Sequence, residues 1–172
     1  MRVGYVKMDS SGNTTCFVLE PLPRRLHPVV ATEIMKTSSL AAEQVGFVEP
    51  PTIPGAIARL QMMGGEFCGN ATRAFALFLA ERQYPGVYPQ GNASHLVVPV
   101  EVSGHEGLIL AEIIHYTDFL RKAIVKVQMP APCLTKKAQL PGIDNSIDII
   151  AFEGITHIVL WNVEPSEDII DL

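Results

Sequence analysis

One cysteine of this chain, Cys68, stands where a glycine-containing turn meets an apolar segment. Residues 63–67 read MGGEF, and residues 74–80 read AFALFLA. The second run is hydrophobic on every face of a helix, which predicts a helix buried through the centre of a domain. At the amino end of such a helix, unpartnered N–H groups and the positive end of the helix dipole favour a thiolate and a bound carboxylate. The pattern therefore predicts a base and an anion site at one helix end.

A structural interpretation of Cys68 stands beside this one, because an unpaired cysteine often behaves as a small, buried and inert hydrophobe. The flanking glycines favour function, since they allow close approach of the backbone and leave space that a packed core residue does not need. With Cys16 and Cys133 the chain has three cysteines, an odd number, and they are widely spaced. That count predicts neither a disulfide framework nor a zinc site, so free thiols in a reducing compartment fit best.

Composition indicates an ordinary soluble protein. The 172 residues are 48% hydrophobic and 18% charged, with a net charge of −5. No apolar run is long enough to cross a bilayer and residues 1–7 lack the apolar core of a signal peptide, so we expect a cytoplasmic protein without a membrane partner. The net negative charge and the lack of lysine and arginine clusters also argue against a nucleic-acid partner.

The segments around Cys68 predict the elements that position it. Residues 3–8 and 15–19 are typical of a hairpin around a turn at 9–13, and residues 28–44 of a helix that Gly46 ends. We expect strands at 45–48, 56–62, 96–102 and 108–114, the last two as a second hairpin, and a new part of the chain from 123–129. The order strand, turn and helix around Cys68 is one that a catalytic loop prefers.

A weak internal repeat suggests two similar lobes. Residues 12–21 and 154–165 both contain a glycine turn, a β-branched strand and a Glu-Pro step. Strands that end at proline are common, so the repeat carries weight only together with the motifs described next.

Three motifs along the chain resemble a known family, namely Ser11-Gly12-Asn13, Cys68-Gly69-Asn70 and Val127-Gln128-Met129-Pro130. They resemble the diaminopimelate epimerase superfamily of cofactor-independent amino-acid racemases and epimerases. More narrowly, residues 43–47 (EQVGF) and 66–72 (EFCGNAT) resemble the histidine racemases of opine-type (staphylopine-type) metallophore biosynthesis. The resemblance implies an α+β, diaminopimelate epimerase-like fold, in which the strands of each pseudosymmetric lobe wrap around a central apolar helix.

The resemblance also implies the domains and the reaction. Residues 1–118 would form the N-terminal lobe, and residues 119–172 the start of an incomplete second lobe. The activity would be racemisation or epimerisation of an amino acid, with histidine as the expected substrate, by two-base thiol/thiolate transfer of the α-proton. No metal, pyridoxal or other cofactor is required by that chemistry, and we expect a homodimer.

The site residues follow from the same resemblance. Cys68 would act as one base, while N–H groups at the helix start would hold the α-carboxylate and absorb negative charge. The residues expected to bind substrate are Asn13, Glu43, Gly69, Asn70 and Ala71, with Glu66 and His157 as further candidates. Asn13 could equally accept a local N–H in its turn, and Glu43 and Glu66 could equally be solvated.

The second base of the family is a cysteine in the second lobe, and this chain shows no suitable one. Cys133 lacks the glycine turn and the helix start, so a structural thiol is the better interpretation. If the second lobe repeats the first, the partner cysteine lies as far after Pro165 as Cys68 lies after Pro21, which is beyond Leu172. We therefore expect a fragment or a truncated homologue.

Three histidines recur at intervals of ten residues, which invites a metal site. His95, His105 and His115 lie in or beside hairpin strands, without the close pairs or completing carboxylates that metal sites use. We expect no metal there. His157 differs because it sits in the glycine turn of the second lobe, facing the expected cleft, although an exposed residue at a strand end is the slightly favoured interpretation.

Three alternatives remain open. A diaminopimelate epimerase is disfavoured because such enzymes usually carry glycine where Ala71 stands. A phenazine-synthesis-like isomerase of the same fold would not need the cysteine. A single lobe that binds a ligand without catalysis is the non-enzymatic alternative, and the missing second base makes it serious.

Overall fold

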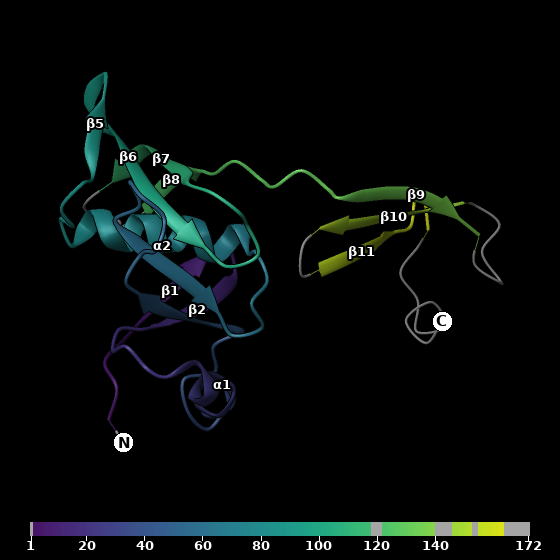
Figure 1. Cartoon of the computed structure of the whole chain (residues 1–172), viewed down its shortest axis with the longest axis horizontal. Helices are drawn as coiled ribbons and strands as arrows, with labels where there is room; N and C mark the ends of the chain where they lie inside the picture. Colours follow the sequence, from purple (N-terminus) through teal and green to yellow (C-terminus); the bar gives the residue numbers. More distant parts are fainter. Residues whose placement is uncertain (1, 118–121, 140–145, 153–154, 164–172) are drawn as a thin grey trace. The chain divides into compact units, whose positions relative to one another are not determined.

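The computed structural model describes residues 2–117, 122–139, 146–152 and 155–163 (Figure 1). The chain forms two compact units, residues 1–129 and residues 130–172, which are described separately. No helix in the described part of the chain has the length and apolar character needed to span a membrane.

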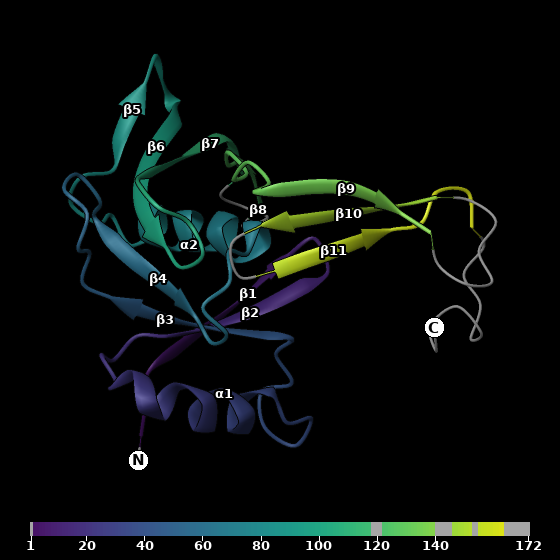
Figure 2. The ribbon, with the colours of Figure 1, turned by 45° about the vertical axis from the view of Figure 1, so that its right-hand side comes forward.

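The first unit is a curled, mixed sheet around one helix. Its hydrogen-bonded strand order is β1 (Tyr5–Ser10), β2 (Asn13–Val18), β3 (Gln44–Glu49), β4 (Ala58–Met62), β6 (Asn92–Val102), β7 (Ile109–Thr117) and β8 (Lys122–Lys126), with β5 (Tyr88–Gln90) paired to β6. The pairs β2–β3 and β4–β6 are parallel and the others antiparallel. Helix α2 (Gly69–Glu81) contacts β1, β2, β6, β7 and β8 (Figures 1 and 2), which confirms the α+β class with strands around a central helix.

Helix α2 is held by aromatic packing. Phe75, Phe78 and Leu79 are buried, and the Phe17 ring of β2 lies 5.6 Å from that of Phe75 and 6.2 Å from that of Phe78. The predicted buried helix is therefore confirmed, although Leu77 remains half-buried because the sheet does not close around the helix on every side. Large apolar side chains of this kind contribute about 1.5–3 kcal/mol each on burial.

The opposite face of the sheet is covered by α1 (His27–Met35), which follows the short 3-10 helix η1 (Arg24–Leu26). Helix α1 packs Val30, Ala31 and Ile34 against a second apolar cluster that includes Cys16 and Phe47. Because successive side chains of a strand point to opposite faces, Cys16 faces this cluster while its neighbour Phe17 faces α2.

The predicted helix over residues 28–44 is too long. Helix α1 ends at Met35 because Lys36 adopts an extended conformation, with φ −56° and ψ 137°. Gly46 does not end a helix but lies inside β3, where an added Cβ would stand 2.6 Å from Cδ1 of Leu60. The glycine is thus required by close packing beneath α2 and not by a turn.

The predicted hairpins are confirmed. Strands β1 and β2 turn at Ser11 and Gly12, whose φ angles are +61° and +89°, and the N–H of Gly12 donates to Oδ1 of Asp9 at 2.6 Å. Positive φ at both central residues is what a tight two-residue hairpin turn needs. Strands β6 and β7 form the second hairpin, with Leu96 opposite Ile113.

The first unit continues past the expected boundary at residues 118 and 119. Residue 118 lies outside the described residues, but β8 pairs with β7, and its Ala123 and Val125 pack against the core around α2. Strand β8 therefore completes the first sheet, and residues 127–129 still belong to the first compact unit, which ends at Met129.

The second unit contains a three-stranded antiparallel sheet. Its order is β11 (Ile155–Val159), β10 (Ile147–Phe152) and β9 (Leu134–Ala138). Strand β11 falls where the repeat predicts one, whereas Gly154 and the Glu164-Pro165 step of that repeat lie outside the described residues. Apolar side chains of this unit are exposed, with Ile158 of β11 at 59% and Trp161, which follows that strand, at 56%.

A buried carboxylate braces the β4 side of the first sheet. Glu101 of β6 is only 1% exposed, and it accepts hydrogen bonds from the N–H of Thr52 (2.5 Å), the hydroxyl of Thr52 (2.8 Å) and the N–H of Ile53 (3.0 Å), and pairs with Arg59. Burial alone would raise the pKa of Glu101, but these hydrogen bonds outweigh it and lower the pKa to about 2.

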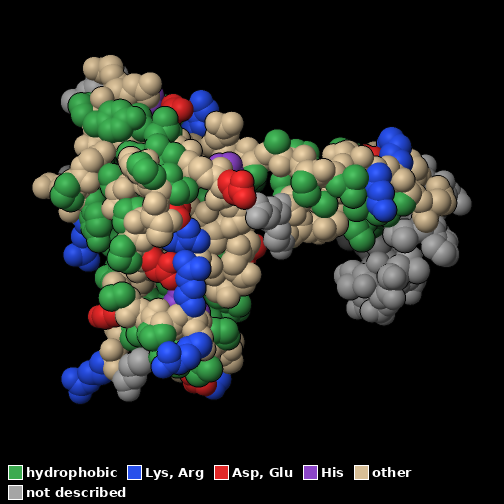
Figure 3. Space-filling view, in the orientation of Figure 1, with side chains coloured by type: hydrophobic (Ala, Val, Ile, Leu, Met, Phe, Trp, Pro, Cys, Tyr) green, Lys and Arg blue, Asp and Glu red, His purple; other side chains and the backbone are tan. Residues whose placement is uncertain are grey.

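On the surface, Figure 3 shows basic and acidic side chains intermixed on the visible face of this unit.

We expect Glu101→Gln to lower the free energy of unfolding at pH 7 by about 3 kcal/mol, because Arg59 loses its buried partner. Since the pKa in the fold lies below the ordinary value of 4.5, the carboxylate stabilises the wild type above that pH and this stabilisation is lost as pH falls through about 2. Urea unfolding at several pH values measures both effects. Glu33→Gln, at an exposed ion pair, is the control and should cost less than about 0.5 kcal/mol. Equal stability and equal pH dependence for Glu101→Gln and wild type would contradict this assignment.

Candidate active site

Cys68 caps the amino end of α2, where the sequence predicts it. Its backbone is extended, with φ −128° and ψ 108°, and its Sγ accepts a hydrogen bond from the N–H of Ala71 at 3.4 Å. Its carbonyl accepts from the N–H of Thr72 at 2.9 Å and from the hydroxyl of Thr72 at 2.8 Å. The thiol therefore lies against the unpartnered N–H groups of a buried helix, where negative charge is stabilised.

Gln44, the first residue of β3, is the second neighbour of the thiol. The S–H of Cys68 donates to Oε1 of Gln44 at 3.1 Å, and the hydroxyl of Thr15 reaches the same oxygen at 3.3 Å. The sequence did not indicate Gln44, because residues 28–44 were expected to form one helix with Gln44 at its end. The available signal for Gln44 was its position immediately after Glu43, a residue that the EQVGF motif did indicate.

Asn13 and Glu43 lie at the same end of the β2–β3 pair as Gln44. Glu43 accepts from the N–H of Thr14 at 2.7 Å, and its own N–H donates to the carbonyl of Thr14 at 3.2 Å. Oδ1 of Asn13 is buried and has no hydrogen-bond partner among the described residues. An unpaired buried acceptor costs about 1–3 kcal/mol, so this oxygen is suited to receive a donor from a bound molecule.

The expected anion-binding residues in the first turn of α2 differ in their hydrogen bonds. The N–H of Ala71 is donated to Cys68, which leaves the N–H groups of Gly69 and Asn70 for a ligand. Oδ1 of Asn70 accepts from Arg73, so this side chain is tied back to its own helix. At Gly69 an added Cβ would stand 3.0 Å from Sδ of Met129, which shows how closely the chain packs over this turn.

Glu66 lies in the turn before Cys68, and its carboxylate folds back over Gly64, where an added Cβ would stand 2.5 Å from Oε2. His157 lies on β11 of the second unit, with its ring edge-on to Phe152 at 5.7 Å. It therefore belongs to a different compact unit from Cys68 and Glu66.

The other two thiols differ from Cys68 in their surroundings. Cys16 is fully buried under α1, and this burial, partly offset by the charge of Lys7, raises its pKa to about 11. Such a thiol is a poor base at neutral pH. Cys133 is exposed in the second unit and donates to the carbonyl of Ala151 at 3.2 Å. No group of three or more histidine, cysteine or acidic side chains with metal-binding geometry occurs within the described ranges.

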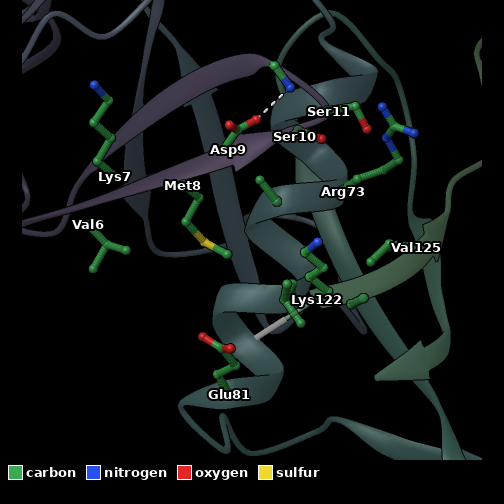
Figure 4. A pocket seen from close by; sticks show the side chains of 14 residues that line it. Val6, Lys7, Met8, Asp9, Ser10, Ser11, Arg73, Glu81, Lys122 and Val125 are labelled. Atoms are coloured by element: carbon green, nitrogen blue, oxygen red, sulfur yellow. Dashed lines mark hydrogen bonds between the residues drawn. The ribbon is translucent and has the colours of Figure 1, made fainter. Parts of the chain in front are cut away.

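A cavity of about 740 Å³ lies along one flank of α2, between the edge strands β1 and β8 (Figure 4). Its apolar lining comes from both strands and the helix, and its polar lining includes Asp9, Ser11, Arg73 and Lys122. Both edge strands contact α2, yet they do not pair with each other, so the curled sheet is open here. Cys68 is not part of the lining.

Solved structures define the class of fold. The chain superposes on a probable proline racemase from Agrobacterium radiobacter K84 with a TM-score of 0.66, covering 91% of this chain and 51% of that chain at 14% identity. A methylitaconate-delta-isomerase gives a TM-score of 0.53, covering 87% of this chain and 41% of that chain at 14% identity. The chain therefore has a fold found in these isomerases. A sequence identity of 14% shows a shared fold and does not show a shared activity.

The sequence comparisons define the family. Residues 2–170 match the model of the histidine racemase CntK N-terminal domain, so the chain belongs to that family. It is 33% identical over 174 residues to a histidine racemase of Fusobacterium nucleatum subsp. nucleatum, covering 98% of this chain and 59% of the relative. A histidine racemase of Staphylococcus aureus (strain Mu50) is 34% identical over 133 residues, covering 74% of this chain and 42% of the relative. The resemblance drawn from the EQVGF and EFCGNAT motifs is confirmed, and the chain spans about three fifths of the Fusobacterium relative.

We expect Gln44→Glu to slow alkylation of Cys68 by about tenfold at pH 7.5, because a carboxylate at the position of Oε1 disfavours the neighbouring thiolate. Mass spectrometry of the Cys68 peptide during iodoacetamide treatment measures the rate, with exposed Cys133 as the reference thiol in the same sample. Gln90→Glu makes the same change at an exposed residue of β5 and should leave the rate unchanged. An unaltered Cys68 rate in Gln44→Glu would show that this contact does not govern the thiol.

Proposed function

We propose that this chain forms the N-terminal, substrate-binding lobe of a cofactor-independent amino-acid racemase that acts on histidine. The observation that carries the proposal is the placement of Sγ of Cys68 at the amino end of α2, between Gln44 and the N–H of Ala71. Family membership and two curated relatives named histidine racemase support the choice of histidine over diaminopimelate.

The reaction begins with removal of the α-proton. The Cys68 thiolate takes this proton to become a thiol, and the electron pair of the broken C–H bond moves toward the α-carboxylate. The N–H groups of Gly69 and Asn70 stabilise the extra negative charge there, as preorganised donors do for other oxyanions. Inversion then requires a second acid to deliver a proton to the opposite face of the α-carbon, after which each group returns to its starting protonation state through solvent.

The remaining site residues orient the substrate in this proposal. Oδ1 of Asn13 accepts an N–H from the α-ammonium group, which would satisfy its unused hydrogen-bonding capacity. Glu43, fixed by Thr14, contributes negative charge near the ammonium or imidazole group. Ala71 acts through its N–H by holding Sγ, and Glu66 and His157 stay candidates without an assigned contact.

The second base is proposed to lie outside the described residues. Cys16 lies on the face of the sheet opposite α2 with its pKa raised, and Cys133 bonds to backbone within its own sheet. The chain spans 59% of the length of the Fusobacterium nucleatum relative. We further propose a cytoplasmic enzyme that forms a homodimer, with neither membrane nor nucleic acid as partner.

A single lobe that binds histidine without racemising it is the second candidate. It is favoured by the surroundings of the two other thiols among the described residues, since Cys16 is buried with a raised pKa and Cys133 donates to a backbone carbonyl. Both candidates place the amino acid at the amino end of α2, so they differ in turnover and not in the location of the site.

We expect the purified 172-residue chain, incubated with L-histidine in deuterium oxide, to exchange the α-proton slowly with retention and to form no D-histidine. A single thiolate returns the isotope to the face from which it removed the proton. Mass spectrometry measures exchange and chiral chromatography measures configuration, with Cys68→Ala as the inactive variant and Cys133→Ala as the matched control. D-histidine from the wild-type chain would place a second base within it, and exchange that survives in Cys68→Ala would remove Cys68 from the mechanism.

A further inference from the structure

The turn between β6 and β7 touches the loop that leads into Cys68. Ser103 is 3% exposed, and its hydroxyl accepts from the N–H of Met62 at 2.9 Å and donates to the carbonyl of Glu66 at 2.9 Å. One side chain thus joins the end of β4 to the residue two positions before Cys68. Both hydrogen-bonding functions of the buried hydroxyl are used, which makes this a rigid connection.

Gly104 brings the backbone of the same turn into direct contact with the loop. An added Cβ would stand 2.2 Å from the backbone N of Phe67, 2.6 Å from the carbonyl carbon of Glu66 and 3.0 Å from Cα of Phe67. These are backbone atoms, so a side chain at this position could be accommodated only if the loop moved. Gly104 also has a φ of +67°, which favours glycine independently.

His105 adds a third contact. Its ring lies edge-on to the ring of Phe67, with the centroids 6.3 Å apart, and Phe67 itself is buried in the core around α2. Ser103, Gly104 and His105 therefore support Glu66 and Phe67 by a hydrogen bond, a backbone contact and a ring contact. We refer to these three residues as the 103–105 strut.

We propose that the 103–105 strut positions Cys68, so that Sγ reaches both Gln44 and the N–H of Ala71. The inference rests on the proposed function, in which Cys68 is the base. The start of α2 is fixed by its core packing, and the strut fixes the two residues on the other side of Cys68, so together they set the extended conformation of the cap. The strut residues act through Glu66 and Phe67, and they are positioning residues.

The chain offers a matched pair of substitutions that separates positioning from general stability. Gly104→Ala and Gly107→Ala each place a side chain on a residue with positive φ in the connection between β6 and β7, where the angles are +67° and +106°. An added Cβ at Gly107 would meet nothing within 4 Å, whereas the one at Gly104 would press on the loop. Backbone strain is common to both variants, and displacement of the loop is particular to Gly104→Ala.

The test measures the rate of Cys68 alkylation by iodoacetamide across pH 6 to 10 in the 172-residue chain, relative to exposed Cys133. We expect Gly104→Ala to slow Cys68 by about tenfold near neutral pH and to move its rate profile to higher pH, because the thiolate loses contact with the helix end. Gly107→Ala should stay within about twofold of wild type. Circular dichroism of each variant tests whether it is folded.

Ser103→Ala provides the second route if Gly104→Ala does not fold. It removes the hydroxyl without adding bulk and should give the same direction of change, while Ser103→Thr keeps the hydroxyl and should restore the wild-type profile. A folded Gly104→Ala or Ser103→Ala variant with an unchanged rate and pH profile would overturn the proposal, as would an equal effect in Gly107→Ala.

Failure of this inference is distinguishable from failure of the proposed function. Alkylation is measured without histidine, so a chain that neither binds nor exchanges histidine would contradict the proposed function and still report on the strut. An unaltered Cys68 profile in the strut variants, together with Cys68-dependent exchange in the wild type, would contradict the strut alone.

Discussion

The packing of α2 inside the curled sheet is the constraint on which the candidate site depends. Phe75, Phe78 and Leu79 are buried against strands from both halves of the sheet, so the helix cannot slide along its axis without exposing them. Its first turn is therefore fixed in place by the core. Cys68 gains an oriented helix dipole and free N–H groups from that core, although it is itself only half-buried.

The neighbours of Cys68 come from segments that are distant in the sequence, and close approach is what joins them. Gly46 lets β3, which begins at Gln44, lie close against the side chains of Leu60 and Phe17, and Gly104 lets the β6–β7 turn rest on the loop before Cys68. A side chain at either glycine would separate surfaces that now touch. These two glycines thus connect tight packing to the chemistry of the site.

The sequence predicted the parts of the fold that local patterns determine. The apolar run of α2, the cap at Cys68 and the turn at Ser11 and Gly12 all follow from residue type and spacing, and the structure confirms them. The predicted end of α1 was wrong, because no strong helix-stop signal follows Met35 and Gly46 was interpreted as that signal. The sequence did not indicate that β8 joins the first sheet, because pairing with β7 depends on the whole sheet and not on the motif at its end.

The site shows the same division. The position of Cys68 followed from local sequence, whereas Gln44 and the 103–105 strut depend on contacts that no local pattern contains. The central claim of the proposed function is that the amino end of α2 binds the substrate histidine. Titration of the ¹⁵N-labelled chain with L-histidine tests it most directly by NMR. We expect the largest amide shift changes at Gly69 and Asn70, in the wild type and in Cys68→Ala alike. Changes confined to the cavity around Arg73 and Lys122, with Gly69 and Asn70 unmoved, would contradict the claim.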